Sequence, residues 1–341
     1  MRNILCVTLI ALLGGCTSTS VTEKYQDKRN DIINVKDKVI EFETGNVLIG
    51  SVSRLYMSNK CLLIADHKSV DKQIHIFNKN DFSYLTSIGN FGEGPEEITV
   101  MGCLAIDEAH HQLYVSDHAK QKIFSYDMDS VMVDSLYKPQ VKTAMNETLF
   151  PSEYQYINDT LSIAVLIKPT STSTFNQFLG RWNMNTGEMI PMKYTHPDIQ
   201  KKRITFAASE KAGIYVECYT RHDLMTICSL DGELLYNIYG PDWDGGNGNK
   251  LQSFGTVMIG NDKIFVSYCG EDYARDSFPT KILVFDLEGN YLKTLETGYK
   301  ISDCCYDSFN NRIILSLNDV VQFAYLDIDG IISVSYTHLR A

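Results

Sequence analysis

The sequence is short of basic residues, and it has no apolar segment long enough to cross a bilayer. Its 31 Lys and Arg are outnumbered by 42 Asp and Glu, which gives a net charge of −11. Nucleic-acid binding rests on Lys and Arg neutralising phosphates, so we expect no nucleic-acid partner. The apolar run at residues 4–13 is shorter than the roughly 20 residues that a transmembrane helix needs.

Cysteine pairs with metal-ligand spacing are also missing. The nine cysteines include Cys6 and Cys16 near the N-terminus, and none of the other seven forms a Cys-x-x-Cys pair. Most of the seven lie in apolar, strand-like stretches, which favours buried small hydrophobic side chains over a disulfide framework. The adjacent Cys304 and Cys305 would then point to opposite faces of one strand.

The N-terminus has the composition of an export signal. A basic Arg2, the short apolar run and small residues before Cys16 are typical of a secretory signal peptide. The sequence Leu13-Gly14-Gly15-Cys16 resembles the bacterial lipobox, which implies that Cys16 is lipidated and that the protein is anchored to a membrane. The alternative is an ordinary signal peptide with a chance cysteine. We predict a signal peptide at residues 1–16 and a flexible, polar spacer at residues 17–34.

The residue after the lipobox cysteine is Thr17 and not Asp. By resemblance to Gram-negative lipoproteins, this implies an outer-membrane anchor that faces the periplasm. Display on the cell surface is the alternative.

A unit of about fifty residues recurs six times in the rest of the chain. Each copy ends in apolar residues followed by Asn, Asp or Ser, at positions 78, 127, 183, 229, 286 and 327. Short strands repeated at this period predict an all-β fold, a six-bladed β-propeller with one four-stranded antiparallel blade per repeat. A glycine for a tight hairpin turn follows the anchor in four copies, at Gly187, Gly232, Gly289 and Gly330.

The blades can be divided into strands by the same pattern. Blade one is predicted at 51–59, 61–66, 73–78 and 84–88, blade two at 101–107, 113–117, 122–127 and 131–136, and blade five at 255–260, 263–268, 281–286 and 291–295. Residues 39–42 have strand chemistry but belong to no unit, so we expect them to close the ring as the outer strand of the last blade. The alternative outer strand is 331–335.

Two segments carry a resemblance to a known family. The segment Gly92-Glu93-Gly94-Pro95-Glu96, after blade one, resembles the signature of six-bladed propeller lipoproteins of Gram-negative anaerobes, which are related to TolB-like and NHL-like propellers. Residues 281–290 resemble the late-blade phrase of the same family. Glu96 departs from the signature, which has glycine there. The resemblance implies a propeller at residues 35–335 and an anchor, but no particular function. Residues 336–341 resemble a translated sequencing adapter and are predicted to be a non-native tail.

Long connections are predicted on only one face of the propeller. The insertions at 66–72, 89–99, 168–177, 241–252 and 270–280 all join blades or join second strands to third strands, which places them together. We name this the loop face and its opposite the turn face. Loop elaboration on a rigid scaffold is where binding sites concentrate. The loop face carries the following aromatic and charged residues: Phe175, Trp243, Tyr273, Arg275 and Phe278.

Five charged residues lie at or near the starts of the inner strands. We predict that they converge at the channel mouth on the loop face, overhung by Trp243, Tyr273 and Arg275. They are Arg54, Glu97, Glu153, Arg203 and Asp303. Their carboxylates could hold calcium in the channel, as in lactonase-like propellers, or could simply be ion-paired with the arginines. Residues 242–249 resemble a calcium loop in composition but lack its terminal Glu, which favours a flexible turn.

No catalytic set of Ser, His and Asp or of Cys and His is recognisable, and His110 and His111 fall in a tight turn. The sequence therefore favours a monomeric binding module over an enzyme. Its partner would be a protein, a glycan or another envelope polymer. The alternative is a divalent-metal-dependent hydrolase or lyase.

Overall fold

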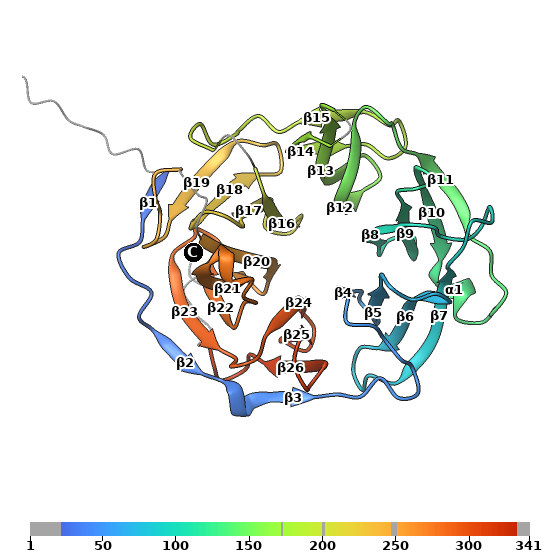
Figure 1. Ribbon diagram of the computed structural model, residues 1–341, viewed down its shortest axis with the longest axis horizontal. Coiled ribbons are helices and arrows are strands. Elements are labelled where there is room, and N and C mark those ends of the chain that lie inside the picture. Colours follow the sequence, from blue (N-terminus) through green and yellow to red (C-terminus); the bar gives the residue numbers. More distant parts are fainter. Residues whose placement is uncertain (1–21, 172, 200–201, 247–250, 333–341) are drawn as a thin grey trace, which may run out of the picture.

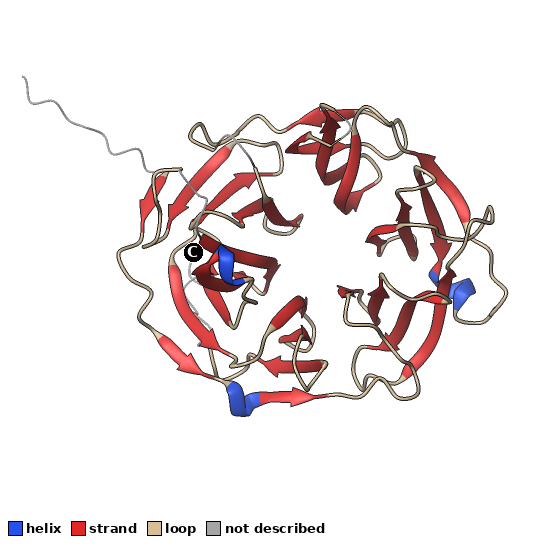
Figure 2. Cartoon of the chain, in the orientation of Figure 1, coloured by secondary structure: helices blue, strands red, loops and turns tan. Residues whose placement is uncertain are grey.

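The ring of six β-sheets is the main feature of the computed structural model, which describes residues 22–171, 173–199, 202–246 and 251–332. The sheets are arranged radially around a central axis (Figure 1). Within these ranges, helix is limited to the short segments α1 (Met128–Val131), η1 (Lys36–Lys38) and η2 (Tyr273–Arg275), as Figure 2 shows. The predicted six-bladed β-propeller is confirmed.

Each blade runs from an inner strand at the axis to an outer strand at the rim. Blade 1 contains β4 (Ser53–Met57), β5 (Cys61–Asp66), β6 (Lys72–Asn78) and β7 (Tyr84–Asn90). Blade 2 contains β8 (Met101–Asp107), β9 (Gln112–Asp117), β10 (Lys122–Asp127) and β11 (Gln140–Ala144). Blade 3 contains β12 (Phe150–Asn158), β13 (Leu161–Pro169), β14 (Phe175–Trp182) and β15 (Met189–Pro191).

The other three blades each include a strand from the N-terminal segment. Blade 4 contains β16 (Ile204–Ser209), β17 (Ile214–Tyr219), β18 (Leu224–Ser229) and β19 (Leu234–Tyr239), with β1 (Glu23–Tyr25) at its edge. Blade 5 contains β20 (Leu251–Gly260), β21 (Lys263–Asp272), β22 (Lys281–Asp286) and β23 (Tyr291–Glu296), with β2 (Ile32–Asn34) at its edge. Blade 6 contains β24 (Ile301–Asp307), β25 (Arg312–Leu317) and β26 (Phe323–Asp327), with β3 (Val39–Glu41) as its fourth strand.

Hydrophobic clusters fill the seams between the blades. Each described cluster draws its residues from two neighbouring blades, as when Leu63 and Ile76 of blade 1 pack with Leu104 and Val115 of blade 2. The middle strands are buried on both faces for this reason, and β5 and β17 have no exposed residue. All seven cysteines from Cys61 onward are free and buried, as predicted. Cys304 packs toward blade 5 and Cys305 toward blade 1, on opposite faces of β24.

The N-terminal segment is a belt around the rim and not a flexible spacer. Its strand β1 pairs in parallel with β19, and β2 pairs in parallel with β23 (Figure 1). Between them, Arg29 inserts its side chain between blades 4 and 5, where it forms an ion pair of 2.8 Å with the buried Asp223. The spacer predicted at residues 17–34 is therefore wrong for residues 22–34. The predicted signal peptide, Cys16 and the predicted tail lie outside the described residues.

The ring closes as predicted. Strand β3 pairs antiparallel with β26, with Ile40 opposite Tyr325. It therefore completes the last blade before the chain enters the first one. The outer strand predicted for blade 2 at residues 131–136 is wrong, because α1 and a turn occupy that stretch and β11 follows only at Gln140. Asp127 begins α1 by accepting a hydrogen bond from the backbone N–H of Ser130, which turns the chain away from the sheet.

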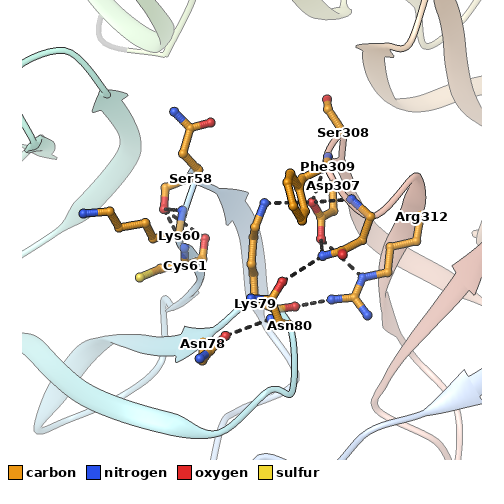
Figure 3. Close-up of polar contacts among 12 residues, drawn as sticks. Ser58, Lys60, Cys61, Asn78, Lys79, Asn80, Asp307, Ser308, Phe309 and Arg312 are labelled. Atoms are coloured by element: carbon orange, nitrogen blue, oxygen red, sulfur yellow. Dashed lines mark hydrogen bonds and ion pairs between the residues drawn. The ribbon is translucent and has the colours of Figure 1, made fainter.

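A buried ionic network crosses the seam between blades 6 and 1 on the turn face (Figure 3). The carboxylate of Asp307, at the end of β24, lies 3.1 Å from the Lys79 ammonium and 3.3 Å from Nε of Arg312. Arg312 also donates to the carbonyl of Lys79, and Asn310 donates to Asp307 at 2.7 Å. Because each charge has a partner, the network joins the first and last blades without leaving a buried charge unpaired.

No helix in the described part of the chain is long and apolar enough to cross a membrane.

Candidate functional site

A channel runs along the axis of the ring, and the inner strands of all six blades line it. Its cavity has a volume of about 1390 Å³. The charged side chains that line it are Arg54, Lys68, Glu153 and Asp303, and the exposed aromatic rings of Phe91 and Phe278 border it. Three of the five residues predicted to converge, Arg54, Glu153 and Asp303, do lie in this channel.

An ion pair crosses the channel wall between non-adjacent blades. Nη1 of Arg54, on β4, lies 2.9 Å from Oε1 of Glu153, on β12, so the pair passes in front of blade 2. In blade 2, the residue at the level of Arg54 is Gly102 of β8. Met101 pairs with Asp117 in blade 2 in the same way as Ser53 pairs with Asp66 in blade 1, and Gly102 and Arg54 are the next residues. Burial lowers the pKa of Arg54, but the neighbouring acidic groups, Glu153 first, raise it more, so this guanidinium stays charged.

Asp303 connects three blades at the channel wall. One carboxylate oxygen accepts the backbone N–H of Leu55 in blade 1 at 2.8 Å, and the other accepts the hydroxyl of Thr256 in blade 5 at 2.7 Å. Burial raises the pKa of Asp303, and these hydrogen bonds offset only part of that effect. Because both oxygens are already used, Asp303 acts first as a structural link between blades.

Two histidines that were not predicted as site residues, His67 and His118, occupy equivalent positions in the channel wall. His67 follows the Asp that ends β5, and His118 follows the Asp that ends β9. Each donates its backbone N–H to the residue before the inner strand, to Val52 at 3.1 Å and to Val100 at 2.9 Å. The sequence signal for both histidines is the dipeptide Asp-His, which occurs at the end of the second strand in two successive units.

Both imidazoles are neutral near pH 7. Burial lowers the pKa of His67 and of His118, and the positive charge of Arg54 lowers both further. The Nε2 atoms of both rings are buried and have no hydrogen-bond partner among the described residues. A Cβ on Gly102 would lie 2.4 Å from Nε2 of His118, so only glycine there lets that ring lie where it does.

Glu97 is held in its own loop and does not reach the channel. Its carboxylate accepts the backbone N–H of Gly94 at 2.8 Å, and a Cβ on Gly92 would lie 2.0 Å from it. Lys120 clamps the same loop by donating to the carbonyls of Gly94 and Glu97, each at 2.6 Å. The glycine-rich segment therefore serves to fold this loop, and the prediction that Glu97 converges with the other charges is wrong.

Arg203 also lies outside the channel lining. Its guanidinium donates to the carbonyl of Lys202 and lies over the ring of Phe175, with its carbon 4.9 Å from the ring centre. The backbone just before β16 thus directs this side chain toward blade 3 and away from the axis.

The three residues predicted to overhang the channel are engaged elsewhere. Trp243 packs against Tyr239, with ring centres 5.0 Å apart, and so belongs to the seam between blades 3 and 4. Tyr273 lies beneath the guanidinium of Arg221 at 3.4 Å. Arg275 is exposed and pairs with Glu271 at 2.9 Å. None of the three lines the channel.

The loop face also differs in detail from its prediction. Half of the insertion predicted at residues 168–177 is a continuation of β13 and β14, which pair as far as Pro169 and Phe175. A long connection at residues 192–203, between β15 and β16, was not predicted.

A group of candidate metal ligands lies on the turn face. Among the described residues, a group of at least three potential ligands within reach of one ion is formed by Asp107, His110 and Asp159. Asp107 already accepts from the ring of His110 at 2.8 Å and from the hydroxyl of Tyr114 at 3.1 Å. In the channel, Glu153 is paired with Arg54, Asp303 is bonded to Leu55 and Thr256, and Glu97 does not reach the cavity, so the arrangement is the ion-paired alternative to a calcium site.

Comparisons with known proteins agree with this architecture. Residues 17–176 match the family model DUF5128, described as a 6-bladed beta-propeller. The match covers less than half of the chain. No curated protein matches the sequence.

Solved structures with the same fold are distant in sequence. A protein from Bacteroides fragilis NCTC 9343 described as exported is 14% identical, with a TM-score of 0.54, over 86% of this chain and 87% of that one. A member of the DUF4221 family from Bacteroides vulgatus ATCC 8482 is 10% identical, with a TM-score of 0.58, over 88% and 98%. A luciferin-regenerating enzyme is 8% identical, with a TM-score of 0.56, over 84% and 93%. At these identities the likeness is one of fold alone.

Proposed function

We propose that the protein is a lipid-anchored propeller of the cell envelope that binds its ligand at the loop-face mouth of the channel. The observation that carries the proposal is the channel itself, a cavity of about 1390 Å³ that joins aromatic rings with a few polar groups. This combination is typical of sites for small ligands and for the ends of larger ones. The ligand would be a protein segment, a glycan or another envelope polymer, bound by a monomer.

The lipobox-like sequence that ends at Cys16 supports the lipid anchor. A solved neighbour described as exported supports an envelope location. We place the protein on the outer membrane, facing the periplasm, and within the wider group of TolB-like and NHL-like propeller lipoproteins. Cell-surface display is the alternative, and protease treatment of intact cells would reveal it.

A metal-dependent hydrolase or lyase is the less favoured function. Such an enzyme would need several free carboxylates around one point in the channel. Glu153 is paired with Arg54, and Asp303 is bonded to Leu55 and Thr256.

Fractionation tests the anchor. Replacing the thiol by Cys16→Ser should move the protein from the membrane fraction to the soluble fraction or block its processing. The matched control is Cys6→Ser, which lies within the apolar run and should leave the protein in the membrane. Unchanged membrane association of Cys16→Ser would contradict the anchor.

Calorimetric titration tests the site. The probes are solubilised envelope glycans, peptidoglycan fragments and short peptides. A probe that binds the wild type should lose its affinity in the double variant Arg54→Met with Glu153→Gln, which removes both charges together. His111→Ala, on the turn face, should bind like the wild type. A probe whose binding survives the double variant but is lost in His111→Ala would overturn the assignment.

A further inference from the structure

The channel changes from polar to apolar along its axis. Each inner strand runs from the loop face to the turn face, so its last residues line the turn-face half of the channel. The strand registers place one residue of each blade at a common level there, opposite the second residue of the neighbouring strand. These residues are Met57, Ile106, Tyr156, Ala208, Ile259 and Tyr306. All six line the channel cavity, and none is charged.

The next two levels toward the loop face also lack charged side chains. The nearer of the two includes Gln155, whose amide oxygen already accepts the backbone N–H of Ala208 at 2.6 Å. The farther one consists of Leu55, Leu104, Tyr154, Phe206, Val257 and Cys304. Three successive levels of the wall therefore offer a ligand mainly apolar surface.

Charged side chains begin one level closer to the loop face. Arg54, Glu153 and Asp303 lie at that level, and Lys68 borders the cavity at the mouth. The side chains of Arg54 and Glu153 are 47% and 39% exposed, so both remain accessible although they pair with each other. Because the cavity is lined by two cations and two carboxylates, a polar group bound there needs no net charge.

The apolar half is accessible as well. Met57, Ile106, Ala208 and Ile259 each pack against a hydrophobic cluster in a seam, yet they are only half-buried. Since they line the cavity, part of their apolar surface stays in contact with water there. An apolar group that displaced this water would be stabilised in proportion to the area it covers.

Backbone edges limit how bulky that apolar group can be. All six inner strands are the first strand of their sheet, so one side of each backbone has no strand partner. Side chains of neighbouring blades bind two N–H groups on these edges, those of Leu55 and Ala208. A slender chain along the apolar side chains leaves the remaining edges hydrated, whereas a ligand that filled the channel would dehydrate them.

We infer that the channel binds an amphiphile with a single apolar chain. Its neutral or zwitterionic head lies at the level of Arg54 and Glu153, and its chain extends toward Met57 and Ile259. This inference rests on the proposed function, because it names the ligand class of the same channel. The ligand is then an end of an envelope glycan or polymer that carries an apolar chain.

Calorimetric titration of the full chain with n-alkyl phosphocholines, from hexyl to dodecyl and each below its micelle concentration, tests the inference. Phosphocholine alone measures what the head contributes. The affinity should rise about fourfold per methylene and level off once the chain has passed the level of Met57. Affinities that are independent of chain length, or phosphocholine that binds as tightly as the decyl compound, would overturn the inference.

Met57 provides two further readouts. In the unmodified protein labelled with carbon-13 at the methionine methyl groups, the Met57 signal should shift when decyl phosphocholine is added. The signal of Met132, which follows α1 outside the channel, should not shift. Met57→Gln keeps the length of the side chain but makes it polar, and should weaken decyl phosphocholine binding about fivefold. Met132→Gln is the matched control and should bind this probe like the wild type.

The outcomes separate this inference from the proposed function. An unshifted Met57 methyl signal, or equal affinities of the two methionine variants, would show that the chain does not enter the turn-face half. Binding that is independent of chain length but is lost in Arg54→Met with Glu153→Gln would refute the apolar site and leave the proposed function standing. Chain-dependent binding that survives all of these variants would place the probe outside the channel and overturn the inference.

Discussion

His67 is the single residue whose titration reports most directly on the electrostatics of the channel. Burial and the charge of Arg54 both hold its pKa below 6.5. Removing that charge by Arg54→Met should therefore raise the pKa of His67, as measured by NMR titration of the imidazole signals. His110 is the internal control, because its hydrogen bond to Asp107 raises its pKa and it lies on the turn face. An unchanged pKa of His67 in the variant would contradict the described position of Arg54.

Asp307 is the residue on which the seam network depends. Asp307→Asn should cost about 3–5 kcal/mol of stability, because it leaves the buried cations of Lys79 and Arg312 without a counter-charge. Asp319→Asn, at an exposed position, is the matched control. Urea unfolding at neutral pH measures both, and equal stabilities of the two variants would argue against a buried network.

The pKa of Asp307 predicts how the stability of the protein changes in acid. Burial alone would raise the pKa of Asp307, but its hydrogen bonds from Asn310 and Lys79 outweigh burial and lower it. A carboxyl with a lowered folded pKa stabilises the protein fully above its unfolded pKa of about 4, and this stabilisation is lost as the pH falls through the folded value. The difference in stability between wild type and Asp307→Asn should therefore be constant near neutral pH and shrink in acid. A constant difference down to low pH would contradict the shift.

Among the elements, the belt of β1 and β2 depends on one buried side chain. Arg29 pairs with Asp223, and its guanidinium carbon lies 5.4 Å from the ring centre of Tyr268. Arg29→Ala should lower stability by about 3–5 kcal/mol, because Asp223 would remain buried without its partner. Lys28→Ala, at the neighbouring exposed position, should change stability little. Limited proteolysis should also cut the Arg29→Ala belt faster, and equal cleavage of both variants would show that the belt is held by its backbone pairing alone.

The strands differ in how far the sequence could predict them. Inner and middle strands such as β5 carry continuous apolar residues and end at polar anchors, so their positions followed from the repeat. The belt strands have only three residues each, and Glu23 and Lys24 of β1 resemble any exposed segment. Strand β1 forms because β19 offers it a free edge for pairing. No local pattern in residues 23–25 indicates where that edge lies.

The candidate site was predictable to a similar degree. The start of an inner strand must face the channel in a propeller, so Arg54, Glu153 and Asp303 could be located from topology. Glu97 and Arg203 follow the same rule in sequence, but neither side chain lines the channel. The carboxylate of Glu97 accepts a hydrogen bond from Gly94, and the guanidinium of Arg203 lies over the ring of Phe175. Such competition between neighbours becomes visible only once the loops have been placed.

At the scale of the whole molecule, the seam between blades 6 and 1 decides whether the ring stays closed. The chain crosses this seam between β3 in blade 6 and β4 in blade 1, and Phe42 directly follows β3. The ring of Phe42 stacks on Phe82 of blade 1, with centres 3.8 Å apart, and lies 5.9 Å from Phe323 of blade 6. One side chain thus contacts both sides of the seam, close to the ionic network, because Arg312 of that network also lies over the ring of Phe82.

The Phe42→Ala variant should therefore destabilise the closed ring as a unit. A buried Phe→Ala change costs about 3–5 kcal/mol, and the half-buried position of Phe42 places the expected loss nearer 2 kcal/mol. Leu48→Ala is the matched control, because Leu48 is 94% exposed. In native-state hydrogen exchange, the variant should lose protection first in β26 and β4, on either side of the seam, while β13 in blade 3 keeps its protection. Because the last blade is completed only by the three-residue strand β3, opening should start here. Loss of protection that is uniform around the ring, or that begins in blade 3, would show that closure by β3 is not the weakest point of the fold.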